Sequence, residues 1–289
     1  MSTTPDLVLL ATCASMPEGE EGWFEGTPLL DALAEVGLEG HWVAWDDASV
    51  DWAGSLVAVR ATWDYETRRE EFLAWAGRLP RMLNSAAIFT WNTDKHYLPR
   101  LAAAGVPVVP TTVVEPGTDA QRELEAAVAA HAPAVVKPTV GAGGRGVLVV
   151  EQAGSFEPLT AGPWAVQPLV ESVRTEGETS VFVIDGEPVS QARKVPAAGE
   201  IRVHEQYGGS TIAVPLTDEA VAVARAAVAA AEDILGERLD YARVDQMRLA
   251  DGTLAVGELE VTEPGLYLDV IPGNARAFAA LVADRIRRA

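Results

Sequence analysis

The sequence predicts a protein of mixed class, with an α/β layer at its N-terminus and α+β layers after it. Over the first ninety or so residues, short apolar runs alternate with helical stretches, which is typical of a mostly parallel sheet flanked by helices. Further along the chain, an Asp-Gly pair separates two apolar runs at Asp185-Gly186 and again at Asp251-Gly252. Such pairs indicate β-hairpins, and therefore antiparallel sheets.

The N-terminal layer is expected to contain three strands and two helices. Pro28 near its start and Gly37 after its end favour a helix over the second apolar stretch. The polar cluster Asn92-Thr93-Asp94 ends this layer and caps a third helix, so we place a boundary at residue 90. The expected strands of this layer are residues 7–12, 40–45 and 56–60, and its expected helices are residues 27–36 and 67–79. The third helix, residues 95–104, begins the next unit.

The rest of the chain is expected to form two further units, residues 91–170 and 171–289. The first should contain a helix over 119–131 and strands over 134–137, 146–151 and 164–169. The second should contain strands over 180–184, 187–192, 241–249 and 253–261, helices over 218–235 and 274–288, and a polar, glycine-bearing segment over 196–209.

Charge excludes several classes of partner. Lys and Arg number 22 against 42 Asp and Glu, which gives a net charge of −20 and disfavours nucleic acid and anionic membranes. The single Cys13 permits no intramolecular disulfide and no Cys-based zinc site. No apolar run reaches ~18 residues, and the run 7–14 has no preceding basic residue, so neither a membrane span nor a signal peptide is expected. We therefore expect a cytoplasmic protein that binds any anion in a local pocket.

A glycine-rich loop follows the strand that ends at Lys137. Gly141, Gly143, Gly144 and Gly146 let the backbone approach a ligand and turn N–H groups toward phosphate oxygens. The loop also satisfies G-x-G-x-x-G, but that fingerprint requires a following helix, whereas residues 147–150 are a β-branched run. The loop is therefore interpreted as a flap between two strands. A plain glycine-rich turn fits the loop alone equally well.

Three carboxylates are predicted to share one face of the last hairpin. If Asp251 and Gly252 form a two-residue turn, Asp245 stands opposite Glu258, and Glu260 projects from the same face. Like charges facing each other require a cation. A hard cation such as Mg²⁺ is one candidate. Arg243, opposite Glu260 in the same register, is the other, as part of a structural ion-pair network.

Few basic residues are available to bind anions. Arg193 and Arg202 flank the start of segment 196–209 and suit a phosphoryl group or a substrate carboxylate. Arg60 and Asp64 lie at the carboxyl end of an expected parallel strand, where open α/β sheets bind ligands. Arg60 is a candidate for a carboxylate and Asp64 for an ammonium group. A surface ion pair beside core aromatic side chains is the alternative.

Taken in order, these residues resemble the ATP-grasp superfamily, most nearly its glutathione-synthetase-like branch. Within it, Arg60 with Trp63-Asp64-Tyr65 and the Gly257–Glu260 stretch are most similar to the O-ureido-serine cyclo-ligase subgroup, which closes the cycloserine ring. Glu260 departs from the branch, which has Asn there. The residues that carry the resemblance are Lys95, Lys137 with the loop 141–146, Gln167 and Leu169 in the hinge 166–170, Glu178, Arg193, Arg202, Asp245, Glu258 and Glu260.

The resemblance implies an ATP-grasp fold behind a Rossmann-like N-terminal domain, and a ligase of antibiotic biosynthesis. Residues 1–90 would bind an amino-acid-like small molecule, 91–170 would carry the flap, and 171–289 the metal site. A substrate carboxylate would become an acyl phosphate that an amine attacks. Similar enzymes are commonly homodimers. The implied roles are ATP binding by Lys95, Lys137, Gly143, Gly144, Gln167, Leu169 and Glu178, Mg²⁺ binding by Asp245, Glu258 and Glu260, catalysis by Arg193 and Arg202, and substrate binding by Arg60, Asp64 and Tyr65.

Other functions remain open at this point. The amine and the carboxylate belong either to one molecule, as in ring closure, or to two, as in an amino-acid or peptide ligase. A nicotinamide-dependent oxidoreductase would use residues 141–146 as its dinucleotide loop and requires a helix after residue 146. A non-catalytic ATP-binding protein on the same fold is the third alternative.

Overall fold

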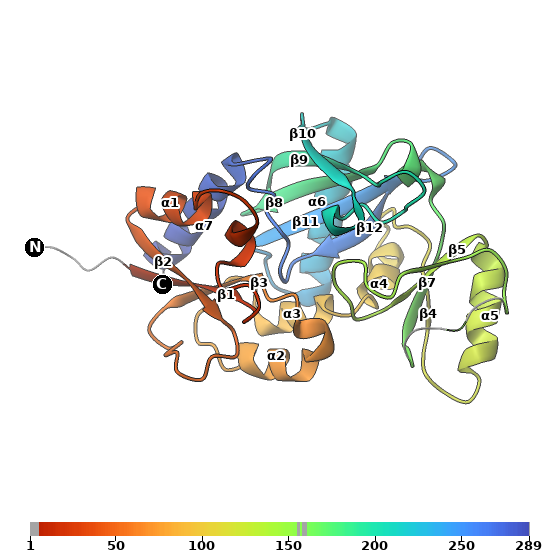
Figure 1. The fold of residues 1–289 in the computed structure, drawn as a ribbon, viewed down its shortest axis with the longest axis horizontal. Coiled ribbons are helices and arrows are strands. Elements are labelled where there is room, and N and C mark those ends of the chain that lie inside the picture. The colour runs from red at the N-terminus through yellow and green to blue at the C-terminus, as the bar shows by residue number, and fades with distance from the viewer. Residues whose placement is uncertain (1–5, 155–156, 158–160, 289) are drawn as a thin grey trace, which may run out of the picture.

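Three β-sheets and seven α-helices form the part of the chain that the computed structural model describes, which is residues 6–154, 157 and 161–288. Figure 1 shows the N-terminal sheet at one end, a sheet of green and yellow strands at the other, and the largest sheet above and between them. No helix within these described ranges is long and apolar enough to cross a membrane.

The N-terminal sheet is parallel, with strand order β2-β1-β3, as the alternation of strands and helices predicted. β3 is buried at every position, whereas most side chains of β2 are half-buried or exposed. A short helix over residues 86–92, which the sequence analysis did not identify, ends this layer. The elements of this layer are β1 (Asp6–Thr12), α1 (Pro28–Glu35), β2 (Leu38–Ala44), β3 (Leu56–Ala61), α2 (Arg69–Ala76) and α3 (Ala86–Asn92).

The second sheet is antiparallel, with strand order β4-β7-β5-β6. The amphipathic helix α5 packs its apolar side against this sheet and forms a separate small core with it. The elements are α4 (Tyr97–Ala103), β4 (Thr112–Val114), α5 (Ala120–His131), β5 (Ala134–Pro138), β6 (Leu148–Val150) and β7 (Trp164–Pro168).

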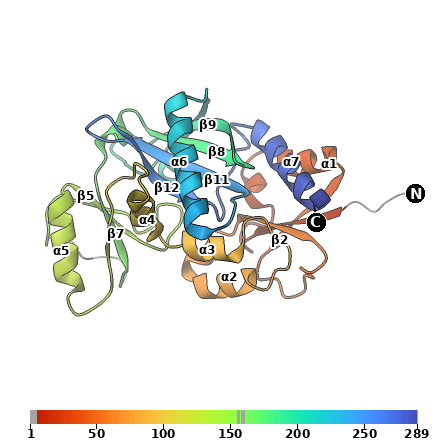
Figure 2. The same cartoon turned by 180° about the vertical axis from the view of Figure 1, so that it is seen from behind.

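The third sheet is antiparallel, with strand order β10-β9-β8-β11-β12. The long helix α6 lies across it, as Figure 2 shows, and its alanine and valine side chains are buried there. The elements are β8 (Glu178–Ile184), β9 (Glu187–Val195), β10 (Ser210–Val214), α6 (Asp218–Leu235), β11 (Tyr241–Arg248), β12 (Leu254–Glu260) and α7 (Gly273–Arg288).

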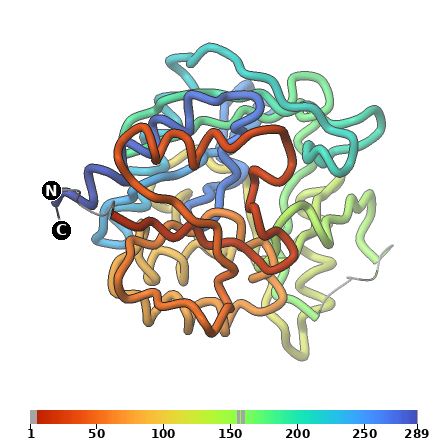
Figure 3. Tube along the Cα trace, turned by 60° about the vertical axis from the view of Figure 1, so that its left-hand side comes forward, coloured from red at the N-terminus to blue at the C-terminus, as the bar shows by residue number. Residues whose placement is uncertain are grey.

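The C-terminal helix connects its own unit to the first one, because it contacts β8 and β9 as well as α1. α7 packs against α1, and both contribute to one core with β1 and β3 (Figures 1 and 3). The three sheets fall within the three expected residue ranges, but this helix couples the last range to the first. The arrangement holds the N-terminal layer beside the third sheet, where the candidate site lies.

Candidate active site

Two adjoining cavities, of about 510 and 210 Å³, form one cleft where the three sheets meet. The larger one extends toward the N-terminal layer, and the smaller one lies between the second and third sheets. Lys137, Gly143, Gly144, Glu258 and Glu260 line both. These five residues, all predicted site residues, are thus brought together from the second and third units.

Two lysines stand on the second-sheet side of the cleft. Lys95 Nζ lies 3.1 Å from Glu258 Oε1 and donates to the carbonyl oxygen of Gly141, 3.1 Å away. Lys137 comes from the end of β5 and lines both cavities, and burial lowers its pKa. Within the described part of the chain, its ammonium group has no hydrogen bond or ion pair. Lys137 therefore presents this group to the cleft.

The glycine loop closes over these lysines. Gly143 and Gly144 have φ of 61° and 68°, which L side chains rarely adopt, and a Cβ at Gly144 would lie 3.3 Å from Arg202. A β-strand, β6, follows the loop. The flap between two strands is therefore confirmed, because a strand occupies the place where a dinucleotide-binding oxidoreductase requires a helix.

Glu66 connects this flap to the N-terminal layer through a hydrogen bond and an ion pair. Its carboxylate accepts a hydrogen bond from the Ala142 N–H, 2.9 Å away, and pairs with the guanidinium of Arg145. Gln206, from segment 196–209, donates to the Gly143 carbonyl oxygen at 2.8 Å. Three parts of the chain that are distant in sequence therefore meet above the cleft. The sequence analysis did not identify Glu66, because a single glutamate outside any motif carries no local signal.

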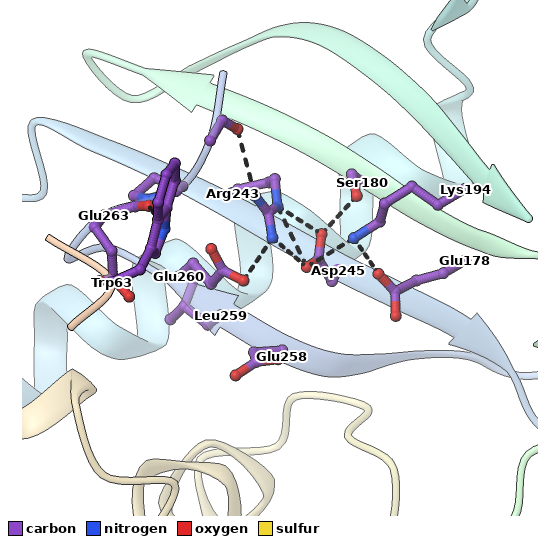
Figure 4. Close-up of polar contacts among 12 residues, drawn as sticks. Trp63, Glu178, Ser180, Lys194, Arg243, Asp245, Glu258, Leu259, Glu260 and Glu263 are labelled. Atoms are coloured by element: carbon purple, nitrogen blue, oxygen red, sulfur yellow. Dashed lines mark hydrogen bonds and ion pairs between the residues drawn. The ribbon is translucent and has the colours of Figure 1, made fainter. Parts of the chain in front are cut away.

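Asp245 lies at the centre of an ion-pair network. It accepts from Ser180 at 2.6 Å and pairs with Arg243 at 3.0 Å and with Lys194 at 3.1 Å. These two cations hold the pKa of its carboxyl well below its usual range although the group is buried. Lys194 also pairs with Glu178 (Figure 4). Arg243 therefore takes part in a structural ion-pair network, which was the alternative to a metal ion in the sequence analysis.

Glu258 and Glu260 face the cleft beside this network. Glu260 pairs with Arg243 at 2.5 Å, while burial and the neighbouring carboxylates raise its pKa to about 7. Within the described ranges, no three His, Cys, Asp or Glu side chains are positioned to share a metal ion. The assignment of Asp245, Glu258 and Glu260 as metal ligands stays a prediction.

The expected nucleotide residues line the smaller cavity, except Lys95, which lines the larger one. Gln167 and Leu169 come from β7 and the hinge after it, and Glu178 begins β8. Gln167 Nε2 donates to Thr111 Oγ1 at 2.8 Å, which fixes the amide. Glu178 is turned toward Lys194. These positions are compatible with the predicted ATP contacts, which remain predictions.

Only one of the two predicted catalytic arginines lies in the cleft. Arg202 lines the smaller cavity, pairs with Glu200 at 2.5 Å and stacks 3.6 Å from the centre of the Tyr207 ring. Arg193 is exposed on the opposite face of β9 and lines neither cavity, because side chains alternate along a strand. Lys194 takes the inward position instead.

Two of the three predicted substrate residues lie in the cleft and one does not. Asp64 and Tyr65 line the larger cavity, and Asp64 accepts from Trp45 Nε1 at 2.9 Å. Arg60 does not reach the cleft. It is fully buried, pairs with Glu20 at 3.1 Å and packs on the ring of Phe278. The substrate-carboxylate role predicted for Arg60 is therefore corrected to a structural one.

Replacing Arg60 should destabilise the fold strongly. Arg60→Met is expected to lower the free energy of unfolding by about 3–5 kcal/mol, because Glu20 would keep a buried charge without its partner. Urea unfolding measures the change. Arg276→Met, at an exposed pair with Glu35, is the control and should change the value by less than about 0.5 kcal/mol. Equal effects would contradict a structural role for Arg60.

Comparison with known proteins identifies relatives over nearly the whole chain. The family model for the N-terminal domain of D-cycloserine synthetase DcsG matches residues 8–84, and that for the ATP-grasp domain of prokaryotic glutathione synthetase matches residues 100–233. The cycloserine biosynthesis protein DcsG of Streptomyces lavendulae is 34% identical, covering 97% of this chain and 99% of its own. A glutathione synthetase of Shewanella oneidensis is 28% identical, covering 56% and 55%.

The solved structures show the same likeness. The crystal structure of D-cycloserine synthetase DcsG aligns with a TM-score of 0.83 at 33% identity, over 97% of this chain and 99% of that one. Fold and sequence together define an ATP-grasp enzyme that joins a carboxylate to an amine with ATP. Within that class, the chain belongs to the family of the cycloserine synthetase DcsG.

Proposed function

We propose that this enzyme uses Mg·ATP to activate the carboxylate of an amino-acid-like substrate and then closes a ring by attack of a nitrogen of the same molecule. The observation that supports this most is the convergence of Lys95, Lys137, the flap and two carboxylates on one cleft. Phosphoryl transfer depends on positioning and on neutralising charge. The cleft offers groups for both.

The smaller cavity would hold the nucleotide. Gln167, Leu169 and Glu178 would surround the adenosine, and the ammonium groups of Lys95 and Lys137 would approach the phosphates. The N–H groups of the glycine flap would bind phosphate oxygens when the flap exchanges its contact with Glu66 for the ligand. Arg202, beside Gly144, would stabilise the transferring group.

The carboxylates fit a magnesium ion. Mg²⁺ is commonly held by one or two protein carboxylates together with substrate phosphates. Glu258 and Glu260 both line the two cavities, and a cation there would offset the burial and the neighbouring carboxylates that raise the pKa of Glu260. Asp245 would join them by exchanging one of its contacts with Arg243 or Lys194. The ion would neutralise the phosphates.

The chemical step follows from these positions. A carboxylate oxygen of the substrate would attack the γ-phosphorus, ADP would leave, and an acyl phosphate would form. The nitrogen would then attack the acyl carbon, the bond from that carbon to the phosphate oxygen would break, and inorganic phosphate would leave with the proton that the nitrogen gives up. The flap and segment 196–209, which already touch through Gln206, would exclude the water that would otherwise hydrolyse the acyl phosphate.

The test is release of ADP and phosphate with Mg·ATP and a panel of amino acids. We expect turnover with O-ureido-serine alone, because the likeness to the cycloserine biosynthesis protein spans nearly the whole of both chains. The panel compounds are supplied singly and then in pairs. Turnover that requires a pair would contradict ring closure and favour an intermolecular ligase. Failure to bind ATP in calorimetry would contradict the proposal as a whole.

A further inference from the structure

Glu263 is a buried carboxylate in the cleft to which none of the roles above has been assigned. It follows β12, is 6% exposed and lines the larger cavity, at the end that faces the N-terminal layer. The Tyr65 hydroxyl donates to its carboxylate. Its backbone carbonyl accepts from Trp63 Nε1 at 3.3 Å. Figure 4 shows Glu263 beside Trp63, at the opposite end of the row from Lys194 and Glu178.

Glu263 differs from the other carboxylates of this row in having no basic partner. Glu258 pairs with Lys95, Glu260 pairs with Arg243, and Glu178 pairs with Lys194. Among the residues that the structure describes, no Lys, Arg or His side chain lies within ion-pair distance of Glu263. A buried carboxylate with a single neutral donor is costly to ionise, and burial with the nearby Glu260 raises its pKa to about 8.

A metal-binding role for Glu263 and an ammonium-binding role for Asp64 both fit this geometry less well. A metal ion that contacts the phosphates needs ligands facing the smaller cavity, where the nucleotide would lie; Glu258 and Glu260 line both cavities, whereas Glu263 lines the larger one alone. Asp64 is less favourable for an ammonium group, because its carboxylate already accepts from Trp45 and lies 3.5 Å from Arg68. Within the described part of the chain, Glu263 is thus the carboxylate of this cavity that lacks a cation.

We propose that Glu263 binds the ammonium group of the substrate, with the Tyr65 hydroxyl orienting its carboxylate, and so selects a free amino acid. The inference rests on the proposed function, since the substrate carboxylate must point toward Lys95 and Lys137 for phosphorylation. The ammonium group then lies on the N-terminal side of the cavity, where Glu263 lies. Its charge supplies the missing partner, and the cavity would reject analogues with a neutral nitrogen.

The test compares O-ureido-serine with N-acetyl-O-ureido-serine, whose α-nitrogen is uncharged. Calorimetry with Mg·ADP present measures both affinities for the wild-type protein and for Glu263→Gln. We expect the wild-type protein to prefer the free amine on the order of 10²-fold, and the variant to lose most of that preference through weaker binding of the free amine. An unchanged preference in Glu263→Gln would overturn the inference.

Glu21→Gln is the matched control. Glu21 is also buried, and no basic side chain among the described residues pairs with it, but it lies outside the cleft and accepts from the Leu29 N–H and from Trp42 Nε1. This variant should keep the wild-type preference and lose thermal stability, since an amide cannot satisfy the same donors. Without ligand, Glu263→Gln should keep or raise the melting temperature, because it replaces a buried carboxyl group whose ionisation no basic side chain among the described residues offsets by an ion pair. A drop of more than about 5 °C in Glu263→Gln would indicate a structural role and overturn the inference.

The binding data separate the two proposals. Binding of both compounds to the wild-type protein with equal affinity would overturn the ammonium site and leave the proposed function intact. Binding of neither compound, with Mg·ATP binding intact, would overturn the proposed substrate and with it this inference.

Discussion

Glu258→Gln is expected to lower kcat on the order of 10³-fold with little change in the fold. Glu258 lines both cavities, and among the described residues its only ion pair is with Lys95, 3.1 Å away, at the place where the phosphates would lie. The amide keeps the volume and one acceptor oxygen but removes the negative charge. The ability to hold a cation against the phosphates should therefore be lost, while packing is kept.

The measurement is ADP release as a function of Mg²⁺ concentration, with circular dichroism to verify folding. Partial recovery at high Mg²⁺ or with Mn²⁺ would support a weakened metal site. The control is Glu187→Gln, an exposed carboxylate on the same sheet that pairs with Arg225. It should retain wild-type turnover. Full activity in Glu258→Gln would refute the assignment of this residue to the metal.

The hairpin that carries Glu258 shows why this part of the site could be predicted. A two-residue turn was assumed, yet the structure has a longer turn, with Arg248 opposite Leu254. The register then shifts by one residue between Asp245 and Gln246, and Gly257 is the extra residue of this bulge. The one-residue shift at the bulge compensates for the extra residue in the turn. Asp245 therefore stands opposite Glu258, so the predicted pairing is correct although the predicted turn is wrong.

In the β8–β9 hairpin the turn is as predicted, but the pairing that follows from it is not. In the register set by the Asp185-Gly186 turn, Glu178 would stand opposite Arg193. A bulge beside Pro188, where the strand lacks an N–H, shifts the pairing by one residue. Glu178 therefore faces Lys194, and Arg193 turns outward. Residue types and their spacing predicted where the strands lie. The position of a bulge depends on packing against neighbouring elements and could not be predicted from them.

The burial of Arg60 by distant parts of the chain could likewise not be predicted from local sequence patterns. Arg60 follows a run of apolar residues at the end of a parallel strand, which is where ligands are usually bound. The loop after β12 returns to this strand end, and the Pro264 carbonyl accepts from the Arg60 guanidinium. α7 then covers the site with Phe278. Contacts between positions about 200 residues apart leave no periodic signal.

Lys194→Met is expected to lower the free energy of unfolding by about 3–5 kcal/mol, because Glu178 and Asp245 would both lose a buried cation. Activity should fall as well, since both carboxylates lie at the cleft. Arg193→Met is the matched control on the same strand. Its side chain is exposed, so the change should stay within about 0.5 kcal/mol and turnover should persist.

The pH dependence of this difference tests the cause. The pKa of Asp245 is held below its ordinary value of 3.8 in the folded protein, so its ion pairs contribute stability that is fully present above pH 3.8 and is lost as pH falls through the folded pKa. Burial raises the pKa of Glu178, the other partner of Lys194, above its ordinary value of 4.5. The gap between Lys194→Met and the wild-type protein, measured by urea unfolding, should therefore begin to shrink as pH falls through the raised pKa of Glu178 and shrink further below about pH 4. Equal losses in Lys194→Met and Arg193→Met would mean that the register shift at Pro188 does not set which side chain enters the cleft.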